Sequence, residues 1–366
     1  MRSRQRPVTA MACVLALLSV FATSCGVYGG GISRTGSVGA DGSKSWNEGG
    51  WQDWDSSKWL RDAADFVNPV IDGLWKPDRM REGVSTDQPV PGGIGDQGIS
   101  DPEPAAVFAE PVPVAYRDSA PVVGKLFFDT PEGPSVCSAT AVADPARPGA
   151  SDLVWTAGHC VHAGAKGGWF RNIVFVPSYN DEGLTSVARQ DATKDQLSPF
   201  GIWWADWAQT SPEWIEQGSS TGGKGSPYDF AVLHVKPPAG SDFTTLEATV
   251  GGAAAIDFGV ESAARIKTVG IWGYPADTPF DGELMFTCEG RPGRLSIRAD
   301  QPSLYRIGCT MTGGSSGGGW FVQDSNGLPV LVSNTSIGPT AQTWLAGPRL
   351  GEGARTIYDA VSGKFA

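Results

Sequence analysis

Histidine is scarce in this chain. Only three are present among 366 residues, at positions 159, 162 and 234. Since imidazole is the side chain that ordinarily changes its charge between about pH 5 and 8, any chemistry that depends on histidine must use one of these three. No histidine follows residue 234, which excludes every catalytic arrangement that places its histidine late in the chain.

Clusters of positive charge are also missing. After the first few residues the sequence has no run of Lys or Arg, and the formal net charge is -11. Binding of nucleic acid through a basic surface is therefore excluded. Helical periodicity is scarce, whereas Gly (49) and Pro (27) are frequent. This composition predicts short strands joined by many turns, and not a helical bundle.

The N-terminus has the three parts of a secretory signal. A basic start with Arg2, Arg4 and Arg6 precedes the apolar run VTAMACVLALLSVFAT, and small residues follow it. This run is short for a membrane span, which needs about 20 residues, and the order of the parts is that of a signal peptide. We expect residues 1–24 to be a signal peptide and the protein to be exported. A signal anchor is the alternative.

The cysteines fit an exported protein. Cys13 lies inside the signal and Cys25 stands alone beside the predicted cleavage point. The other four form an even set, which suggests disulfides: Cys137, Cys160, Cys288 and Cys309. The stretch ATSC resembles a bacterial lipobox, apart from Ala22 where Leu is usual. We expect Cys25 to be lipidated and to anchor the protein to a membrane; ordinary cleavage with a spare thiol is the alternative.

Composition divides the rest of the chain into an extension and a main domain. Residues 25–112 are largely Gly-, Ser-, Pro- and Asp-rich, and we interpret them as a tether or linker. One stretch inside it has apolar residues at helical spacing, which predicts a short helix that packs on the main domain or acts as a pro-segment: Trp59, Leu60, Ala63, Phe66 and Val67.

The main domain is expected over residues 113–366. Short β-rich runs alternate there with turns, and this pattern predicts an antiparallel all-β sandwich or barrel. The stretch RTIYDAV predicts a short helix near the C-terminus. We see no internal repeat.

The Gly-rich stretch CTMTGGSSGGGW, between apolar β-forming runs, contains the candidate nucleophile. GSSGG matches the G-x-S-x-G elbow of α/β-hydrolases, but that fold needs a catalytic His after the Ser, and none follows. The subtilisin order, acid before His, needs a parallel α/β context that this turn-rich chain lacks. The order His–Asp–Ser remains, with His159 in TAGHC, Asp229 in YDFAVLHV and Ser316 in TGGSSGG.

These motifs, in this order, resemble those of the chymotrypsin-like serine peptidases: TAAHC, a D-[IFY]-A-L strand and G-x-S-G-G. The likeness covers roughly residues 120–340, and TGGSSG is nearer to the bacterial glutamyl-endopeptidase-like branch than to digestive trypsins. The resemblance implies an all-β fold of two six-stranded antiparallel β-barrels, with a mostly irregular N-terminal extension. It also implies polypeptide substrates and an acyl-enzyme mechanism without cofactor.

The resemblance assigns a role to each residue. His159 takes the proton of the Ser316 hydroxyl, which is a poor nucleophile alone, and Asp229 holds the imidazole in the required tautomer. The N–H groups of Gly314 and Ser316 form the oxyanion hole. The implied disulfides are Cys137–Cys160 and Cys288–Cys309. A metal site built from His159, His162, Cys137 and Cys160 is disfavoured, because an exported protein favours disulfides.

Two positions depart from the pattern. Ser315 stands where digestive members have an Asp that pairs with a new N-terminus, so that activation switch is expected to be missing. Thr310 stands at the expected floor of the specificity pocket. An acid at this position would favour Arg or Lys substrates, and none is present. Ser333 and Asn334 are expected on the strand that pairs with the substrate backbone. Substrate preference and oligomeric state stay open.

The sequence therefore predicts an exported serine endopeptidase anchored through Cys25. One alternative is an idle relative that binds a partner through the same cleft, although an intact triad argues against it. Its contact surface would be the Trp-rich segment of Trp203, Trp204, Trp207 and Trp214. An esterase or acyltransferase that uses the same triad is the other alternative.

Overall fold

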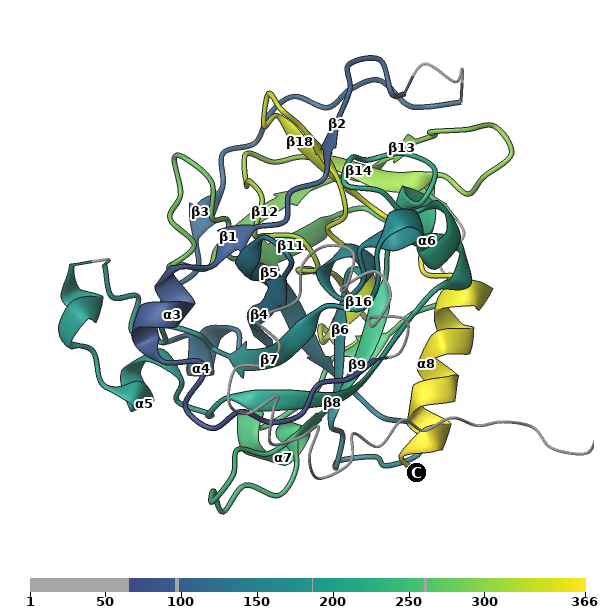
Figure 1. Ribbon diagram of the computed structural model, residues 1–366. Coiled ribbons are helices and arrows are strands. Elements are labelled where there is room, and N and C mark those ends of the chain that lie inside the picture. Colours follow the sequence, from purple (N-terminus) through teal and green to yellow (C-terminus); the bar gives the residue numbers. More distant parts are fainter. Residues whose placement is uncertain (1–65, 96–98, 186, 260–261) are drawn as a thin grey trace, which may run out of the picture. The chain divides into compact units, whose positions relative to one another are not determined.

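The computed structural model describes residues 66–95, 99–185, 187–259 and 262–366. The predicted signal peptide, Cys25 and most of the predicted helix around Trp59 lie outside these residues; Phe66 and Val67, its last two positions, are not helical. The described chain is mostly β and forms two lobes (Figure 1). The all-β prediction is thus confirmed.

The first lobe is a closed barrel of six antiparallel strands. They are β4 (Val123–Thr130), β5 (Gly133–Val142), β6 (Leu153–Thr156), β7 (Arg171–Pro177), β8 (Trp203–Thr210) and β9 (Ala231–Lys236). Their order is β5-β4-β7-β8-β9-β6, and β6 pairs again with β5, which closes the barrel. Every residue of β4 is buried, because one face lines the barrel and the other packs on the second lobe.

The second lobe consists of two sheets that share one apolar core. The first contains β10 (Ala255–Ile256), β16 (Pro329–Asn334), β15 (Gly319–Gln323), β11 (Val269–Gly273), β12 (Phe286–Gly290) and β3 (Glu110–Pro111). The second contains β13 (Gly293–Leu295), β14 (Leu304–Gly308) and β18 (Trp344–Gly347). Where one second barrel was expected, its strands are thus divided between two sheets, with Ile271, Ile307 and Trp320 packed between them.

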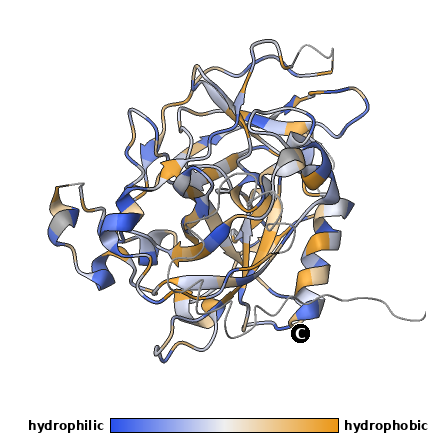
Figure 2. Cartoon of the chain, viewed as in Figure 1, coloured by the Kyte–Doolittle hydropathy of each residue, from blue (hydrophilic) through white to orange (hydrophobic). Residues whose placement is uncertain are grey.

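Helices are few and mostly short. The C-terminal helix α8 (Glu352–Lys364) confirms the predicted one and is longer at both ends. Its buried residues Ala354, Ile357, Tyr358 and Val361 recur at helical spacing and face β9 (Figure 2). The others are α3 (Pro77–Arg81), α4 (Tyr116–Ser119), α5 (Lys194–Leu197), α6 (Pro212–Gln217), α7 (Leu246–Val250), and the 3-10 turns η2 (Gly158–Cys160), η3 (Gly164–Lys166), η4 (Ala188–Asp191), η5 (Ser226–Tyr228) and η6 (Ala263–Arg265).

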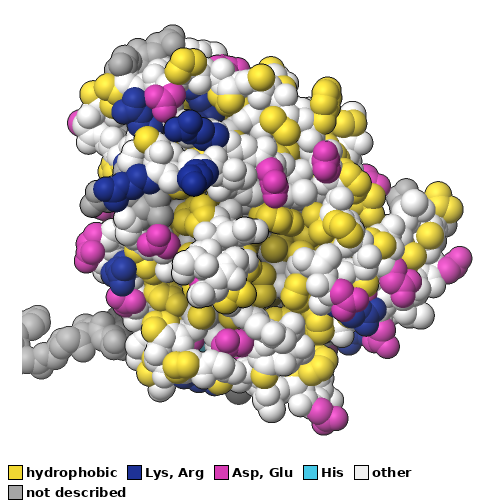
Figure 3. Space-filling model, turned by 180° about the vertical axis from the view of Figure 1, so that it is seen from behind, with side chains coloured by type: hydrophobic (Ala, Val, Ile, Leu, Met, Phe, Trp, Pro, Cys, Tyr) yellow, Lys and Arg dark blue, Asp and Glu magenta, His cyan; other side chains and the backbone are white. Residues whose placement is uncertain are grey.

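The helices and the surface of the described residues have two general features. None of their helices is both long and apolar enough to cross a membrane. On the face seen in Figure 3, most basic side chains gather on one side, whereas the acidic ones are spread over it.

The part of the predicted linker that the structure describes, residues 66–95 and 99–112, packs on both lobes. Trp75, Met80 and Val112 are buried. Three short strands of this part pair with the lobes. β1 (Val84–Ser85) joins the first sheet beside β5, β3 joins the second-lobe sheet beside β12, and β2 (Pro89–Val90) forms a separate two-stranded sheet with β17 (Gly338–Pro339). The composition of this part predicted an irregular backbone. Composition cannot show which strand edges of the two lobes remain unpaired, and therefore cannot predict where such a segment forms strands.

A buried charged cluster joins the lobes. Lys125 of β4 donates from Nζ to the carbonyl of Gly282 at 2.7 Å and lies over the rings of Phe127 and Tyr179. Burial lowers the pKa of Lys125 to about 8, although the carboxylate of Glu283 opposes the shift. The folded state therefore holds the charged form of Lys125 at a cost in free energy.

We expect this cost to appear in the dependence of stability on pH. Between pH 8 and 10 the unfolded Lys125 still binds a proton that the folded protein has released, so the free energy of unfolding rises with pH. The rise should be about 2 kcal/mol larger for the wild type than for Lys125→Met, as measured by urea denaturation. Equal slopes for the two proteins would contradict the expectation.

Candidate active site

His159 lies in η2, directly after β6. Its backbone N–H donates to Asp229 Oδ1 at 2.8 Å, and its Nδ1 lies 2.7 Å from Asp229 Oδ2. A carboxylate beside Nδ1 favours the proton on that nitrogen and leaves the lone pair on Nε2. Nε2 is buried and has no hydrogen-bond partner among the described residues. It is therefore the nitrogen that is free to accept a proton.

Asp229 comes between η5 and β9 and is fully buried. Its Oδ2 also accepts a hydrogen bond from Ser336 Oγ at 2.6 Å, and its carbonyl accepts one from Asn334 Nδ2 at 3.0 Å. Two side chains of the second lobe thus hold an acid of the first lobe beside His159. The sequence did not predict the role of Ser336, because this Ser stands among several small polar residues and no motif surrounds it.

The loop that carries Ser316 joins β14 to β15 and is tied to β5. Ser138 of β5 donates its N–H to the carbonyl of Ser316 at 2.7 Å. Its hydroxyl donates to the carbonyl of Gly314 at 2.9 Å. One residue of the first lobe therefore holds the main chain on both sides of Ser315.

Gly317 brings this loop close to η2. A Cβ on Gly317 would lie 2.1 Å from Thr156 Oγ1 and 2.9 Å from the nitrogen of Ala157. No side chain fits there, so only glycine allows this approach. Because Ala157 precedes His159 by two residues, the contact places Ser316 in the neighbourhood of the imidazole.

Gly314 has a backbone φ of 90°, which side chains resist, and an added Cβ would lie 2.7 Å from the carbonyl oxygen of Tyr274. Among the described residues, no acceptor binds the N–H of Gly314 or of Ser316. The neighbouring Ser315 turns its hydroxyl to the carbonyl of Thr312 at 2.5 Å. Two backbone donors are therefore available to an oxygen of a bound molecule.

Both predicted disulfide pairings are present. Cys137–Cys160 ties β5 to η2, and Cys288–Cys309 ties β12 to the residue after β14. The Cys137 and Cys160 sulfurs and a His159 ring nitrogen lie within 4.8 Å of one another. Because these sulfurs are bonded to each other, neither offers a thiolate to a metal ion.

The residues predicted to shape the specificity pocket have their polar groups occupied by the chain itself. Thr310 Oγ1 accepts a hydrogen bond from the backbone of the N-terminal extension at 2.9 Å. Ser333 and Asn334 are fully buried, and Ser333 Oγ donates to the carbonyl of Pro348 at 2.7 Å. These two side chains therefore point into the interior.

The other two histidines have structural partners. His162 Nδ1 accepts a hydrogen bond from the N–H of Gly164 at 3.0 Å, and burial lowers the pKa of His162 to about 4. His234 Nδ1 lies 2.5 Å from Asp206 Oδ1, and its ring stacks on Phe365. Neither is arranged to act on Ser316.

We expect an NMR titration to find that His162 stays neutral down to about pH 4. Since the unfolded protein binds this proton near pH 6.5, the contribution of His162 to stability is lost as pH falls from about 6.5 toward 4. His162→Gln identifies the resonance by its loss. A pKa near 6.5 for this residue in the folded protein would contradict the expectation.

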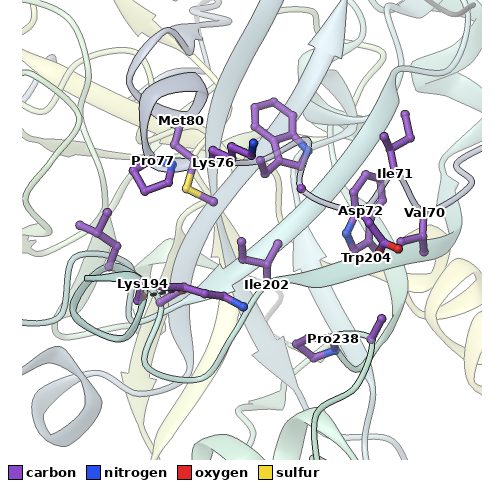
Figure 4. A pocket seen from close by; sticks show the side chains of 15 residues that line it. Val70, Ile71, Asp72, Lys76, Pro77, Met80, Lys194, Ile202, Trp204 and Pro238 are labelled. Atoms are coloured by element: carbon purple, nitrogen blue, oxygen red, sulfur yellow. Dashed lines mark hydrogen bonds between the residues drawn. The ribbon is translucent and has the colours of Figure 1, made fainter. Parts of the chain in front are cut away.

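Two of the cavities lined by the described residues adjoin the first lobe. One of about 280 Å³ lies away from His159 and is lined by apolar side chains of the extension and of β8, among them Ile71, Met80 and Trp204 (Figure 4). The other, of about 420 Å³, has His159 in its wall, together with Asp87 and Trp214. The second one adjoins the candidate catalytic residues.

Solved structures resemble this chain, although no family model and no curated protein matches it. A thermostable serine protease from an extremophilic microorganism is 33% identical, with a TM-score of 0.53, over 68% of this chain and 99% of its own. Protease Anisep from Arthrobacter nicotinovorans is 26% identical, with a TM-score of 0.51, over 70% and 99%. A Glu endopeptidase in complex with MPD is 20% identical, with a TM-score of 0.49, over 72% and 99%.

The 33% identical protease is covered over almost its whole length. Its likeness agrees with the closed first barrel and the two-lobed fold. The chain therefore belongs to the chymotrypsin-like serine proteases.

Proposed function

We propose that this protein is an exported serine endopeptidase that cleaves peptide bonds through Ser316, His159 and Asp229. The observation that carries the proposal is the state of His159. Its Nδ1 is held 2.7 Å from Asp229, while its buried Nε2 has no partner among the described residues. A buried imidazole nitrogen without a partner is costly, and a nucleophile that approaches on that side supplies the missing hydrogen bond.

The reaction follows from these positions. Ser316 Oγ attacks the scissile carbonyl carbon and gives its proton to His159 Nε2, while Asp229 stabilises the resulting imidazolium. The carbonyl oxygen becomes negative and accepts hydrogen bonds from the N–H groups of Gly314 and Ser316. His159 then protonates the leaving amine as the C–N bond breaks. Water, deprotonated by His159, hydrolyses the acyl-enzyme and restores Ser316.

Export and anchoring belong to the same proposal. The two disulfides favour an oxidising compartment, and the N-terminal sequence favours a lipid on Cys25. Cys25→Ala should move the protein from the membrane fraction to the soluble one. If this variant were still found in the membrane fraction, the proposed lipid anchor would be wrong, and the catalytic proposal would be unaffected.

No observation favours the idle relative over the enzyme. Its supposed contact surface, the Trp-rich segment, is largely interior: Trp203 and Trp214 are fully buried, and Trp204 is buried too. Trp204 and Trp214 reach only the walls of cavities, so the segment presents no exposed apolar patch to a partner. Esterase activity shares every step above, and only a comparison of amide with ester substrates distinguishes it from peptidase activity.

A fluorophosphonate probe tests the catalytic proposal. It reacts with an activated serine, so mass spectrometry of the folded, labelled protein should find the adduct on Ser316. Heat-denatured protein is the control and should remain unlabelled, because the activation needs the folded arrangement. Absence of label on Ser316 in folded protein, after long incubation, would refute the assignment.

A further inference from the structure

Residues 84–90 of the N-terminal extension run past both sides of the candidate active site. β1 pairs with Ser135 and Val136 of β5, directly before the Cys137 that ties β5 to η2. β2 pairs with β17, which begins two residues after Ser336. Because β5 belongs to the first lobe and Ser336 to the second, the segment passes from one lobe to the other (Figure 1).

Polar side chains fasten the first half of the segment. Ser85 Oγ lies 2.9 and 2.8 Å from the two carboxylate oxygens of Asp277, to which it donates. Thr86 Oγ1 lies 3.4 Å from Cys137 Sγ, at the disulfide beside His159. Hydrogen bonds to charged groups are among the stronger ones, so the contact with Asp277 contributes to docking.

The middle of the segment rests on the loop that carries the nucleophile. A Cβ on Gly313 would lie 2.7 Å from Ser85 Oγ and 2.8 Å from Asp87 Cβ. Gly313 precedes Ser316 by three residues and borders the predicted oxyanion hole. No room for another chain remains between the segment and the loop at this point.

Asp87 also interacts with the catalytic groups electrostatically. Desolvation and the Asp277 carboxylate raise the pKa of Asp87, while His159 acts in the opposite direction. The side chain of Asp87 is exposed to solvent, and it lines the same cavity as His159. The carboxyl group therefore lies within electrostatic reach of the imidazole.

The second half of the segment is anchored as a bound peptide would be. Val90 is buried in a small apolar core with Ile337 and Trp344. The N–H of Gly222 donates to the carbonyl of Pro89 at 3.1 Å. Main-chain pairing with a strand, together with a pocket for one side chain, is how proteins bind an added strand.

We propose that residues 84–90 are an autoinhibitory segment that occupies the substrate cleft of the full chain. The inference rests on the proposed function, because it concerns access to the same Ser316. A polypeptide substrate needs the space between β5 and β17 that the segment fills. Since both ends of the segment continue into parts packed on the lobes, its effective concentration at the cleft is high.

The segment blocks the cleft without being presented for cleavage. A peptide bond poised for attack places its carbonyl oxygen on the amides of Gly314 and Ser316. Among the described residues no acceptor occupies these amides, so no carbonyl of the segment lies there. The full chain therefore has reduced activity on peptides, and it does not digest its own segment in this arrangement.

The test weakens the docking of the segment in the full chain and measures kcat/KM on a chromogenic peptide. Val90→Glu places a charge in the apolar core and should raise kcat/KM at least tenfold. Val187→Glu makes the same chemical change at a side chain that is 75% exposed, and should leave kcat/KM unchanged. Ser85→Ala, which leaves the core intact, should raise it by a smaller factor. Intact mass confirms that each chain is uncut.

A synthetic peptide supplies the reverse experiment. GVSTDQPVPG, the sequence of residues 83–92, should inhibit Val90→Glu when added in trans, and a scrambled peptide should not. Equal activity of the wild type, Val90→Glu and Ser85→Ala, with no inhibition by the peptide, would overturn autoinhibition and leave the proposed function standing. A folded Val90→Glu that neither hydrolyses peptides nor takes a fluorophosphonate on Ser316 would overturn both.

Discussion

Ser316→Ala is expected to lower kcat on a peptide substrate by about 10⁶-fold, the scale of loss seen when other serine proteases lose their nucleophile. KM should change little, because the hydroxyl takes part in bond formation and not in holding the substrate. Ser316 is tied to the first lobe through its carbonyl, which accepts a hydrogen bond from the N–H of Ser138, so the fold should survive the loss of the hydroxyl. Steady-state kinetics measure kcat and KM, and circular dichroism measures whether the fold survives.

Ser315→Ala is the matched control for this prediction. It removes the same atom from the adjacent residue, whose hydroxyl donates to the carbonyl of Thr312. Since that contact is internal to the loop, kcat should fall by less than tenfold. A similar loss in both variants would mean that loop structure, and not the Ser316 hydroxyl, limits the reaction.

The double variant His159→Ala/Ser316→Ala tests whether these two residues act as one unit. Residues that act as one unit show losses that do not add, so the double variant should be no slower than Ser316→Ala alone. If the two losses multiplied, His159 and Ser316 would act independently, which the proposed proton transfer does not allow.

Asp229→Asn should lower kcat by about 10⁴-fold at neutral pH. An Asn amide at this position can donate to His159 Nδ1, which then becomes the acceptor and moves the proton to Nε2. The imidazole would lose its ability to take the proton of Ser316. Three contacts of 2.6 to 2.8 Å join His159 and Ser336 to the two carboxylate oxygens of Asp229. The site is therefore built closely around a carboxylate.

Ser336→Ala is the control, because it removes one of the donors to Asp229 without changing the tautomer of His159. A hydrogen bond to a charged group contributes about 1.5–3 kcal/mol, so the loss in kcat should not exceed about 100-fold. The pH dependence of kcat for both variants provides the readout. Activity of Asp229→Asn within tenfold of the wild type would contradict the role proposed for Asp229.

The candidate catalytic residues could be predicted because each stands in a short motif that the chemistry constrains. TAGHC and TGGSSGG mark His159 and Ser316, and the scarcity of histidine left one possible chain order. The all-β class followed from turn-rich composition in the same way. Both disulfide pairings are those that the resemblance implied.

Residues far apart in the sequence could not be assigned in this way. Ser336 reaches Asp229 across the two lobes, and nothing near Ser336 in the sequence indicates that partner. Ser333 and Asn334 point into the interior because of where β16 ends. The β15–β16 register shifts between Trp320 and Phe321, and a shift of one residue changes the face on which later side chains lie.

The sequence by itself therefore determined the class of fold, the disulfide-forming cysteines and the three residues of the candidate triad, because local motifs and composition carry them. Only the tertiary structure decided what surrounds them. It placed Ser336 on the acid, tied the nucleophile loop to Ser138, and laid the segment at 84–90 along β5 and β17. These contacts depend on which strand edges and backbone groups remain unpaired once both lobes have folded, and that is a property of the assembled fold.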